Sequence, residues 1–174
     1  MDTDLELNKS PKIFISHSSN DAEIALALVK LLEFLGIKDI FCSSVAGYGI
    51  PVGEDIYQSI KHEYEEHELF MICLISPEYL HSYMSLNEMG AAWILKNNYL
   101  TFILSSLTEK SLDGTCIGKN NIAIIWNDKD IMARMNEFKD KMIEQFCLLP
   151  PNPNRWEDER NVFVRNLNSY QSVP

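Results

Sequence analysis

The sequence is poor in positive charge and has no long apolar run. Fifteen lysines and arginines stand against 25 aspartates and glutamates, and the net charge is −10. Nucleic-acid backbones are bound by clustered lysines and arginines, so we expect no nucleic acid as a partner. The longest apolar run, residues 69–75 (LFMICLI), is far shorter than the roughly 20 residues that cross a bilayer. Met1 is followed by acidic residues instead of a secretion leader, so we expect a cytoplasmic protein without a membrane anchor.

Cysteine is also scarce, and the four that occur form no CxxC pair: Cys42, Cys73, Cys116 and Cys147. We predict that they are reduced residues of the core, as is usual in the cytoplasm. No histidine lies at metal-ligand spacing from them, and the GxSxG and HExxH motifs are missing. The sequence therefore predicts neither a metal site nor one of the familiar nucleophile motifs.

Five short apolar runs alternate with stretches of helical period. The runs lie at residues 12–16, 39–43, 69–76, 99–106 and 122–126, and the helical stretches at 21–36, 54–66, 85–97 and 128–146. This alternation predicts a doubly wound α/β fold, with a parallel five-stranded sheet in the order 2-1-3-4-5 and helices on both faces. We expect one domain over residues 11–147, a flexible N-terminal segment at 1–10, and a C-terminal extension at 148–174 whose packing the sequence leaves open.

Three polar or glycine-rich segments follow the first three predicted strands. They are HSSND (17–21), the loop SSVAGYGIPVG (43–53), and the segment that begins SPEYL (76–80). In doubly wound sheets, ligands bind beyond the carboxyl ends of the strands, where the strand order reverses. We therefore expect these segments to meet at one edge of the sheet, and Glu88 lies in the last of them.

Glu88 has two interpretations. In a helix it shares a face with Met84, Ala91 and Ala92, a small and apolar surface that would leave room for a ligand beside the carboxylate. Ser85-x-x-Glu88 also matches a capping box, in which the glutamate bonds to backbone at the helix start. The local sequence alone favours the cap, whereas the expected position at the sheet edge favours a ligand.

The segment ISHSSND (15–21) turns a strand into a helix, a geometry that favours anions because free N–H groups converge there. Its hydroxyls and carboxylate are also good helix caps, with Asn20 or Asp21 as the cap itself. His17 is not needed for capping. The glycines of GYGIPVG (47–53) have the wrong spacing for a dinucleotide fingerprint, which favours a surface loop that contacts a ligand or partner.

Three blocks together resemble Toll/interleukin-1 receptor (TIR) domains of the bacterial stand-alone kind. The blocks are KIFISHSSND (12–21), FCSS (41–44) with GEDI (53–56), and CLISPEYLHSYMSLNEMGAAW (73–93), and the resemblance covers about residues 11–147. It implies a flavodoxin-like fold. In many bacterial and plant members of the family, it also implies cleavage of NAD⁺ at the bond between nicotinamide and ribose.

The family glutamate lies in a segment often written S-x-W-C-x-x-E, and Glu88 is the matching position. Ser82 matches the leading serine, whereas Met84 stands where tryptophan is common and Ser85 where cysteine is common. These departures keep the carboxylate but change residues linked to base stacking and to assembly. The resemblance therefore implies that Glu88 is catalytic and that Met84 lies on the substrate side.

The same resemblance implies the contacts of the substrate. Phosphate or ribose would be held by Ser16, His17 and Ser18, and the nicotinamide side would be closed by Ser44 and Tyr48. NAD⁺ is then a substrate, and neither a bound cofactor nor a metal ion is expected. The implied role is antiviral immunity, in which the enzyme depletes NAD⁺ or makes a cyclic or conjugated ADP-ribose signal for a separate effector.

Two other interpretations stay open. A non-catalytic TIR adaptor would act by self-association through the 43–53 loop, and Glu88 would be only a cap. An enzyme similar to nucleoside deoxyribosyltransferases would share the general fold and use a glutamate nucleophile. The ISHSSND block favours the TIR family over the second of these.

Overall fold

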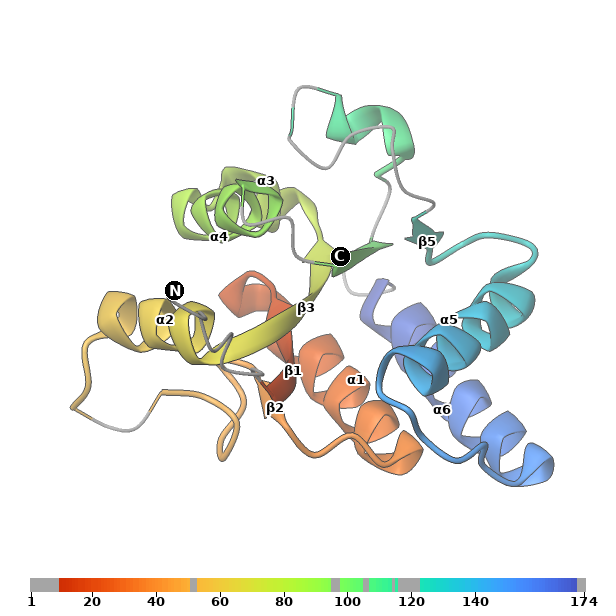
Figure 1. Cartoon of the computed structure of the whole chain (residues 1–174). Helices are drawn as coiled ribbons and strands as arrows, with labels where there is room; N and C mark the ends of the chain where they lie inside the picture. Colours follow the sequence, from red (N-terminus) through yellow and green to blue (C-terminus); the bar gives the residue numbers. More distant parts are fainter. Residues whose placement is uncertain are drawn as a thin grey trace.

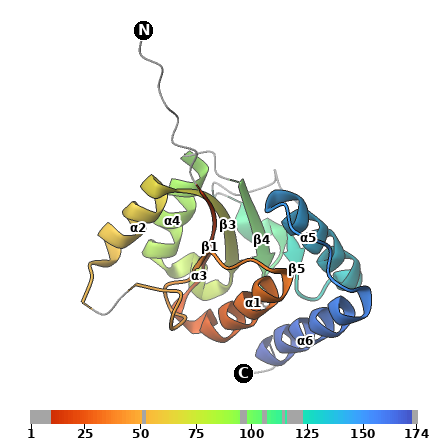
Figure 2. The ribbon, with the colours of Figure 1, turned by 60° about the horizontal axis from the view of Figure 1, so that its bottom comes forward.

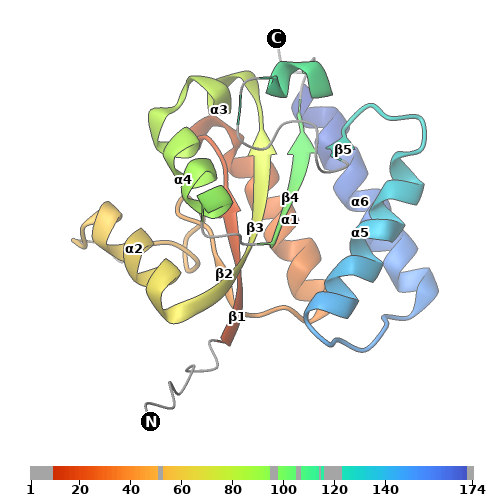
Figure 3. The same cartoon turned by 45° about the horizontal axis from the view of Figure 1, so that its top comes forward.

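Five parallel strands form one sheet in the part of the chain that the structure describes. The computed structural model describes residues 10–50, 53–94, 98–104, 107–113, 115 and 123–171. The strands are β1 (Ser10–Ser16), β2 (Ile40–Phe41), β3 (His67–Ile75), β4 (Asn98–Ile103) and β5 (Ile124–Ile125). Their order, β2-β1-β3-β4-β5, confirms the predicted doubly wound α/β class. Figure 3 shows the arrowheads of β3 and β4 at the same edge of the sheet.

Strand β3 is the centre of the sheet and pairs along its length with β1 and β4. The pairing with β1 runs from Ser10 opposite His67 to Ser16 opposite Cys73. Alternate residues of β3 belong to two separate hydrophobic clusters, with Phe70, Ile72 and Leu74 in one and Leu69, Met71, Cys73 and Ile75 in the other. Because both faces of the strand are covered, its sequence is a continuous apolar run.

Helices cover both faces of the sheet. They are α1 (Ala22–Leu35), α2 (Ile56–Glu66), α3 (Pro77–His81), α4 (Tyr83–Ile94), α5 (Ile131–Gln145) and α6 (Pro153–Gln171), with short 3₁₀ helices at Ser19–Asp21 and Glu109–Leu112. Figures 1 and 2 show α1, α5 and α6 on one face and α2, α3 and α4 on the other. The two hydrophobic clusters fill the two layers between the sheet and these helices.

The ends of α1 follow from local sequence. Gly36 ends the helix in the left-handed conformation at φ 99°, and its N–H donates to the Glu33 carbonyl at 2.9 Å. Glycine tolerates this conformation because it has no Cβ, so the predicted stop at Gly36 is confirmed. Asp21 is the residue before the helix, as expected, but its side chain makes no capping hydrogen bond.

The C-terminal extension contains a helix, α6, that is part of the core. Trp156, Phe163, Val164 and Leu167 of α6 are buried in the same cluster as α1 and α5. The indole N–H of Trp156 donates to the side chain of Asn136 on α5 at 2.8 Å. Pro153 occupies the first position of the helix, where its missing N–H costs nothing. The extension, whose packing the sequence left open, therefore packs on the body of this chain.

Several predicted boundaries differ from the structure. β1 begins at Ser10, inside the predicted flexible segment 1–10, and α4 begins at Tyr83 instead of residue 85. Cys42 and Cys73 are buried and form no disulfide, but Cys147 is exposed, so its prediction as a core residue was wrong. It follows the end of α5 in a turn with φ 51°. Predictions for residues 1–9, 51–52, 95–97, 105–106, 114, 116–122 and 172–174 lie outside the described residues, as do the side chains of Ala91 and Ala92.

Candidate functional site

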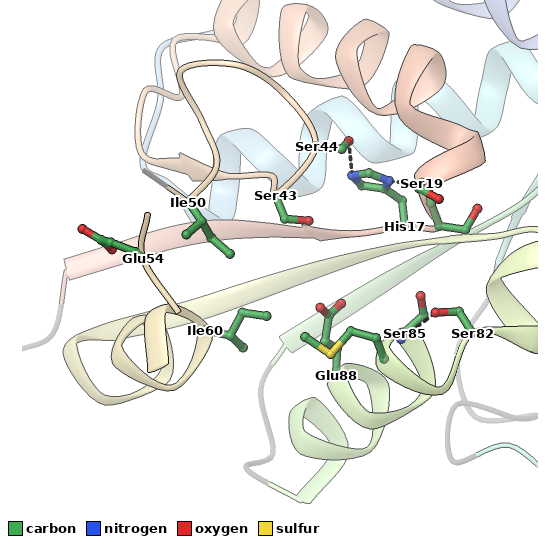
Figure 4. Close-up of a pocket in the computed structure, with 12 residues that line it drawn as sticks. His17, Ser19, Ser43, Ser44, Ile50, Glu54, Ile60, Ser82, Ser85 and Glu88 are labelled. Carbon is green, nitrogen blue, oxygen red and sulfur yellow. Dashed lines mark hydrogen bonds between the residues drawn. The ribbon is translucent and has the colours of Figure 1, made fainter. Parts of the chain in front are cut away.

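A cavity of about 580 Å³ lies at the carboxyl ends of β1 and β3, where the strand order reverses. Its described lining comes from the segment after β1 (His17, Ser18, Ser19), the segment after β2 (Ser43, Ser44, Ile50, Glu54), α2 (Ile60) and α4 with the residue before it (Ser82, Met84, Ser85, Glu88). The three segments that were expected to meet at this edge are thus brought together. Figure 4 shows His17 and Ser44 on one side of the cavity and Glu88, Ser82 and Ser85 on the other.

Glu88 is nearly buried in one wall of this cavity, opposite His17 and Ser44 (Figure 4). The residue is only 9% exposed, and its Oε2 accepts a hydrogen bond of 2.6 Å from the hydroxyl of Ser16. Burial raises the pKa of the Glu88 carboxyl from its usual 4.5 to about 7, and the Ser16 hydrogen bond opposes this rise. The carboxylate therefore pays a desolvation cost that a cationic group in the cavity would relieve.

The capping box favoured by the local sequence is not formed. Helix α4 begins at Tyr83, and the hydroxyl oxygen of Ser82 accepts a hydrogen bond of 3.2 Å from the N–H of Ser85. Ser82 is thus the cap, and Glu88 falls in the second turn of the helix. From there its carboxylate reaches across to Ser16 of β1 instead of back to the helix start.

Ser16 lies behind Glu88 and is not among the described residues that line the cavity. It is 1% exposed, and its hydroxyl lies 2.9 Å from the hydroxyl of Tyr79, which bonds to the carbonyl of Ser85 at 3.1 Å. The resemblance implies that Ser16 holds the phosphate or ribose of a ligand. In the structure its partners are protein atoms, because the last residue of β1 points toward α3 and α4.

His17 lies on the opposite wall with both ring nitrogens in contact with polar atoms. Its Nδ1 lies 2.7 Å from the carbonyl oxygen of Ser18, and its Nε2 lies 2.9 Å from the Ser44 hydroxyl and 3.3 Å from the Cys42 thiol. Burial lowers the pKa of His17, although the Ser18 carbonyl and the nearby Asp21 raise it. The structure places His17, Ser18 and Ser44 around one cavity, and the substrate contacts that the resemblance implies for them stay predictions.

Asp21 connects the turn after β1 to distant parts of the chain. Its carboxylate is fully buried and accepts hydrogen bonds of 2.7 Å from the hydroxyls of Ser18 and Ser76, and a third from the hydroxyl of Tyr170 on α6. The sequence assigned Asp21 to helix capping. Ser18 is three residues away, but Ser76 and Tyr170 are 55 and 149 residues away in the chain, so no local pattern could have identified these two partners.

Tyr48 is not among the described residues that line the cavity, although the resemblance implies that it closes the nicotinamide side. Its hydroxyl donates to the carboxylate of Glu33 on α1, and this bond raises the pKa of Tyr48. The loop itself is held by backbone: the N–H of Cys42 donates to the Tyr48 carbonyl at 2.8 Å. Ile50 and Glu54, to which the resemblance gives no substrate contact, line the cavity instead, and Met84 also lines it.

Two features are absent from the described residues. They contain no cluster of three or more histidine, cysteine, aspartate or glutamate side chains that could hold a metal ion. None of the helices in the described ranges combines the length and apolar character that crossing a membrane would require.

The parallel sheet, its strand order and the cavity at the reversal point define a flavodoxin-like α/β protein. A model of the TIR domain family matches residues 13–137, so the chain belongs to the TIR family. The resemblance seen in the three sequence blocks is thereby confirmed.

The known proteins that are similar to this chain include a receptor domain of an animal and a bacterial protein. The crystal structure of the TIR domain of the Toll-related receptor TRR-2 from Hydra magnipapillata has the same fold, with a TM-score of 0.56 and 20% identity over 74% of this chain and 95% of that chain. The uncharacterized protein YddK of Bacillus subtilis (strain 168) is 44% identical over 106 residues, or 59% of this chain. The match spans 38% of the length of YddK.

Proposed function

We propose that this TIR domain cleaves NAD⁺ between nicotinamide and ribose, with Glu88 as the catalytic carboxylate. The observation that carries the proposal is a carboxylate only 9% exposed that lines a cavity of about 580 Å³ among hydroxyl and imidazole groups. A cavity of this size is in the range that holds ligands of low molecular weight. NAD⁺ is the substrate that the TIR resemblance implies.

The chemistry requires one carboxylate and no second acid. When the C1′–N bond breaks, its electron pair goes to the pyridinium ring, so nicotinamide departs neutral and needs no proton. Positive charge then develops on C1′ and the ring oxygen of ribose, and an ionised Glu88 beside the sugar stabilises it. Water or a hydroxyl of the substrate captures C1′ and releases one proton.

The environment of Glu88 suits this role. A pKa of about 7 means that, near neutral pH, the empty site holds a mixture of neutral and ionised carboxyl. The positively charged nicotinamide ring of a bound substrate favours the ionised form, because opposite charges attract strongly where water is scarce. The hydrogen bond from Ser16 to Oε2 fixes the orientation of the carboxylate.

The biological context follows from the family alone. We propose a role in bacterial antiviral immunity, in which the domain either depletes NAD⁺ or releases a cyclic or conjugated ADP-ribose that a separate effector senses. TIR domains commonly self-associate, and we expect activity to depend on assembly of this chain. Hydrolysis and cyclisation would share the ribosyl cation and differ in the hydroxyl that captures it.

The test is nicotinamide release from NAD⁺ by the purified protein and by Glu88→Gln, over a range of protein concentrations in which self-association is measured by sedimentation. We expect Glu88→Gln to lose about 100-fold or more in turnover, the scale for removal of a charge that stabilises a transition state. Glu54→Gln is the matched control, since Glu54 lines the same cavity but is exposed to water. It should lose much less.

Two outcomes would overturn the proposal. Equal turnover by the wild-type protein and Glu88→Gln would remove the carboxylate from the mechanism. Absence of nicotinamide release from protein that has assembled would favour the non-catalytic adaptor, for which Glu88→Gln should leave self-association unchanged.

A further inference from the structure

We infer that His17 and Ser44 form a proton-accepting pair, which takes the proton of the hydroxyl nucleophile as that nucleophile captures the ribosyl cation. The inference rests on the proposed function, since it assigns the second half of the same reaction. It gives His17 a chemical role in place of the contact to phosphate or ribose that the resemblance implies. The argument begins from the two nitrogens of the imidazole ring.

The hydrogen bond at Nδ1 fixes the tautomer of the ring. Nδ1 lies 2.7 Å from the carbonyl oxygen of Ser18, and a carbonyl oxygen can only accept. Nδ1 must therefore carry a hydrogen. Because burial lowers the pKa of His17, the neutral ring with an unprotonated Nε2 is the favoured form near pH 7.

An unprotonated Nε2 has one lone pair that accepts, and two possible donors lie within hydrogen-bond distance of it. These are the Ser44 hydroxyl at 2.9 Å and the Cys42 thiol at 3.3 Å. Burial raises the pKa of the Cys42 thiol to about 12, and Glu88 adds to the rise, so the thiol keeps its proton and is not a nucleophile. Asp21 is the carboxylate that stabilises an imidazolium at His17, because it raises the pKa of that ring.

His17 and Ser44 lie where they can reach a substrate bound in the cavity. His17 and Ser44 both line the cavity, on the side opposite Glu88 (Figure 4). With its hydrogen directed to Nε2, the Ser44 hydroxyl has lone pairs left to accept a hydrogen bond from a nucleophile in the cavity. The carboxylate and the base thus act on one sugar from two walls.

The step balances as follows. The C1′–N bond has already broken, and nicotinamide holds its electron pair. An oxygen of water or of a substrate hydroxyl then forms a bond to C1′ and loses its proton to Ser44 Oγ, while the Ser44 proton moves to Nε2 of His17. The resulting imidazolium, stabilised by Asp21, later returns the proton to solvent.

The first experiment examines the free protein and does not depend on NAD⁺ cleavage. Long-range ¹H–¹⁵N NMR of the imidazole rings should show His17 as the neutral tautomer with hydrogen on Nδ1 at pH 7. His62, which is exposed on α2, is the reference ring in the same spectrum. A hydrogen on Nε2, or a fully protonated ring, would overturn the inference whether or not the protein cleaves NAD⁺.

The second experiment compares two fates of the ribosyl cation. Exchange of labelled nicotinamide into NAD⁺ needs no base, because nicotinamide attacks without losing a proton, whereas capture by a hydroxyl does lose one. His17→Asn keeps a donor near the Ser18 carbonyl but removes the base. We expect it to raise the ratio of exchange to net NAD⁺ loss about 100-fold or more, the lower end of the range for general base catalysis, and Ser44→Ala to raise it less.

The ratio separates this role from a structural one. Damage to the cavity, like Glu88→Gln, should lower exchange and net loss together and leave their ratio unchanged. An unchanged ratio in His17→Asn would therefore refute the base. If the assembled wild-type protein performs neither reaction, the proposed function fails and this role fails with it, while the NMR result still decides the tautomer.

Discussion

Replacing the buried carboxyl of Glu88 should change the pH dependence of stability in a defined direction. The unfolded chain ionises Glu88 near its usual pKa of 4.5, whereas the folded chain holds the proton to about pH 7. Between these values the folded state binds more protons than the unfolded state, so the free energy of unfolding falls as the pH rises. The contribution is complete below about pH 4.5 and lost above about pH 7.

The magnitude follows from the same two values. A tenfold change in proton affinity corresponds to about 1.4 kcal/mol, so ionised Glu88 lowers the free energy of unfolding by about 3 kcal/mol above pH 7. Glu88→Gln cannot ionise and keeps a carbonyl that accepts from Ser16. We therefore expect Glu88→Gln to gain about 3 kcal/mol relative to wild type between pH 4.5 and pH 8.

Urea unfolding at a series of pH values measures this difference directly. Glu23→Gln, on the exposed side of α1, is the control for loss of one negative charge. The other titrating groups are shared by wild type and Glu88→Gln, so they cancel in the comparison. Stability curves for the two proteins that run parallel from pH 4.5 to pH 8 would refute the buried, uncharged state of Glu88.

Three further substitutions test the surroundings of the site. Ser16→Ala removes the hydrogen bond that opposes the rise in the Glu88 pKa, so this pKa should rise further. The pH profile for nicotinamide release should then shift to higher pH. Gly49→Ala places a Cβ 2.6 Å from the Ser43 carbonyl oxygen, and thermal unfolding should show a loss of roughly 1–3 kcal/mol. Leu167→Ala opens a cavity under α6, and urea unfolding should show a loss of roughly 2–5 kcal/mol.

Gly49→Ala and Leu167→Ala each have a matched control. Gly47→Ala lies in the same loop with nothing within 4 Å of the added Cβ, so it separates left-handed backbone strain from collision with the backbone. Val162→Ala, on the exposed side of α6, should cost much less than Leu167→Ala. Equal losses of stability in Gly49→Ala and Gly47→Ala would contradict the predicted collision, and equal losses in Leu167→Ala and Val162→Ala would contradict the predicted cavity. An unchanged pH profile in Ser16→Ala would contradict the effect of its hydrogen bond on Glu88.

The fold was predictable because its signals are local and repeated. The alternation of apolar runs with helical periods predicted the strand order, and the unbroken run of β3 predicted a strand covered on both faces. The first and last residues of the helices and strands were predicted less accurately. The start of α4 at Tyr83 depends on Ser82 acting as the cap, and the sequence offered Ser85 as an equally good candidate.

The location of the site could be predicted from the sequence, but the contacts between its side chains could not. Segments that follow β1, β2 and β3 meet because parallel strands end at one edge, and this places His17, Ser44 and Glu88 around one cavity. The direction of each side chain depends on neighbours far away in the sequence. Tyr48 turns to Glu33, and Ser16 turns to Glu88, because partners on α1 and α4 were within reach.

The hydrogen bond between Tyr170 and Asp21 connects α6 to the segment around Ser18 that lines the cavity. The family match ends at residue 137, yet the carboxylate that holds Ser18 loses one of its three donors whenever α6 separates from α1. Detachment of α6 and loosening of this segment should thus occur in a single cooperative event. The rate at which a protease cuts near residue 150 would then measure how often the segment around Ser18, opposite Glu88, opens.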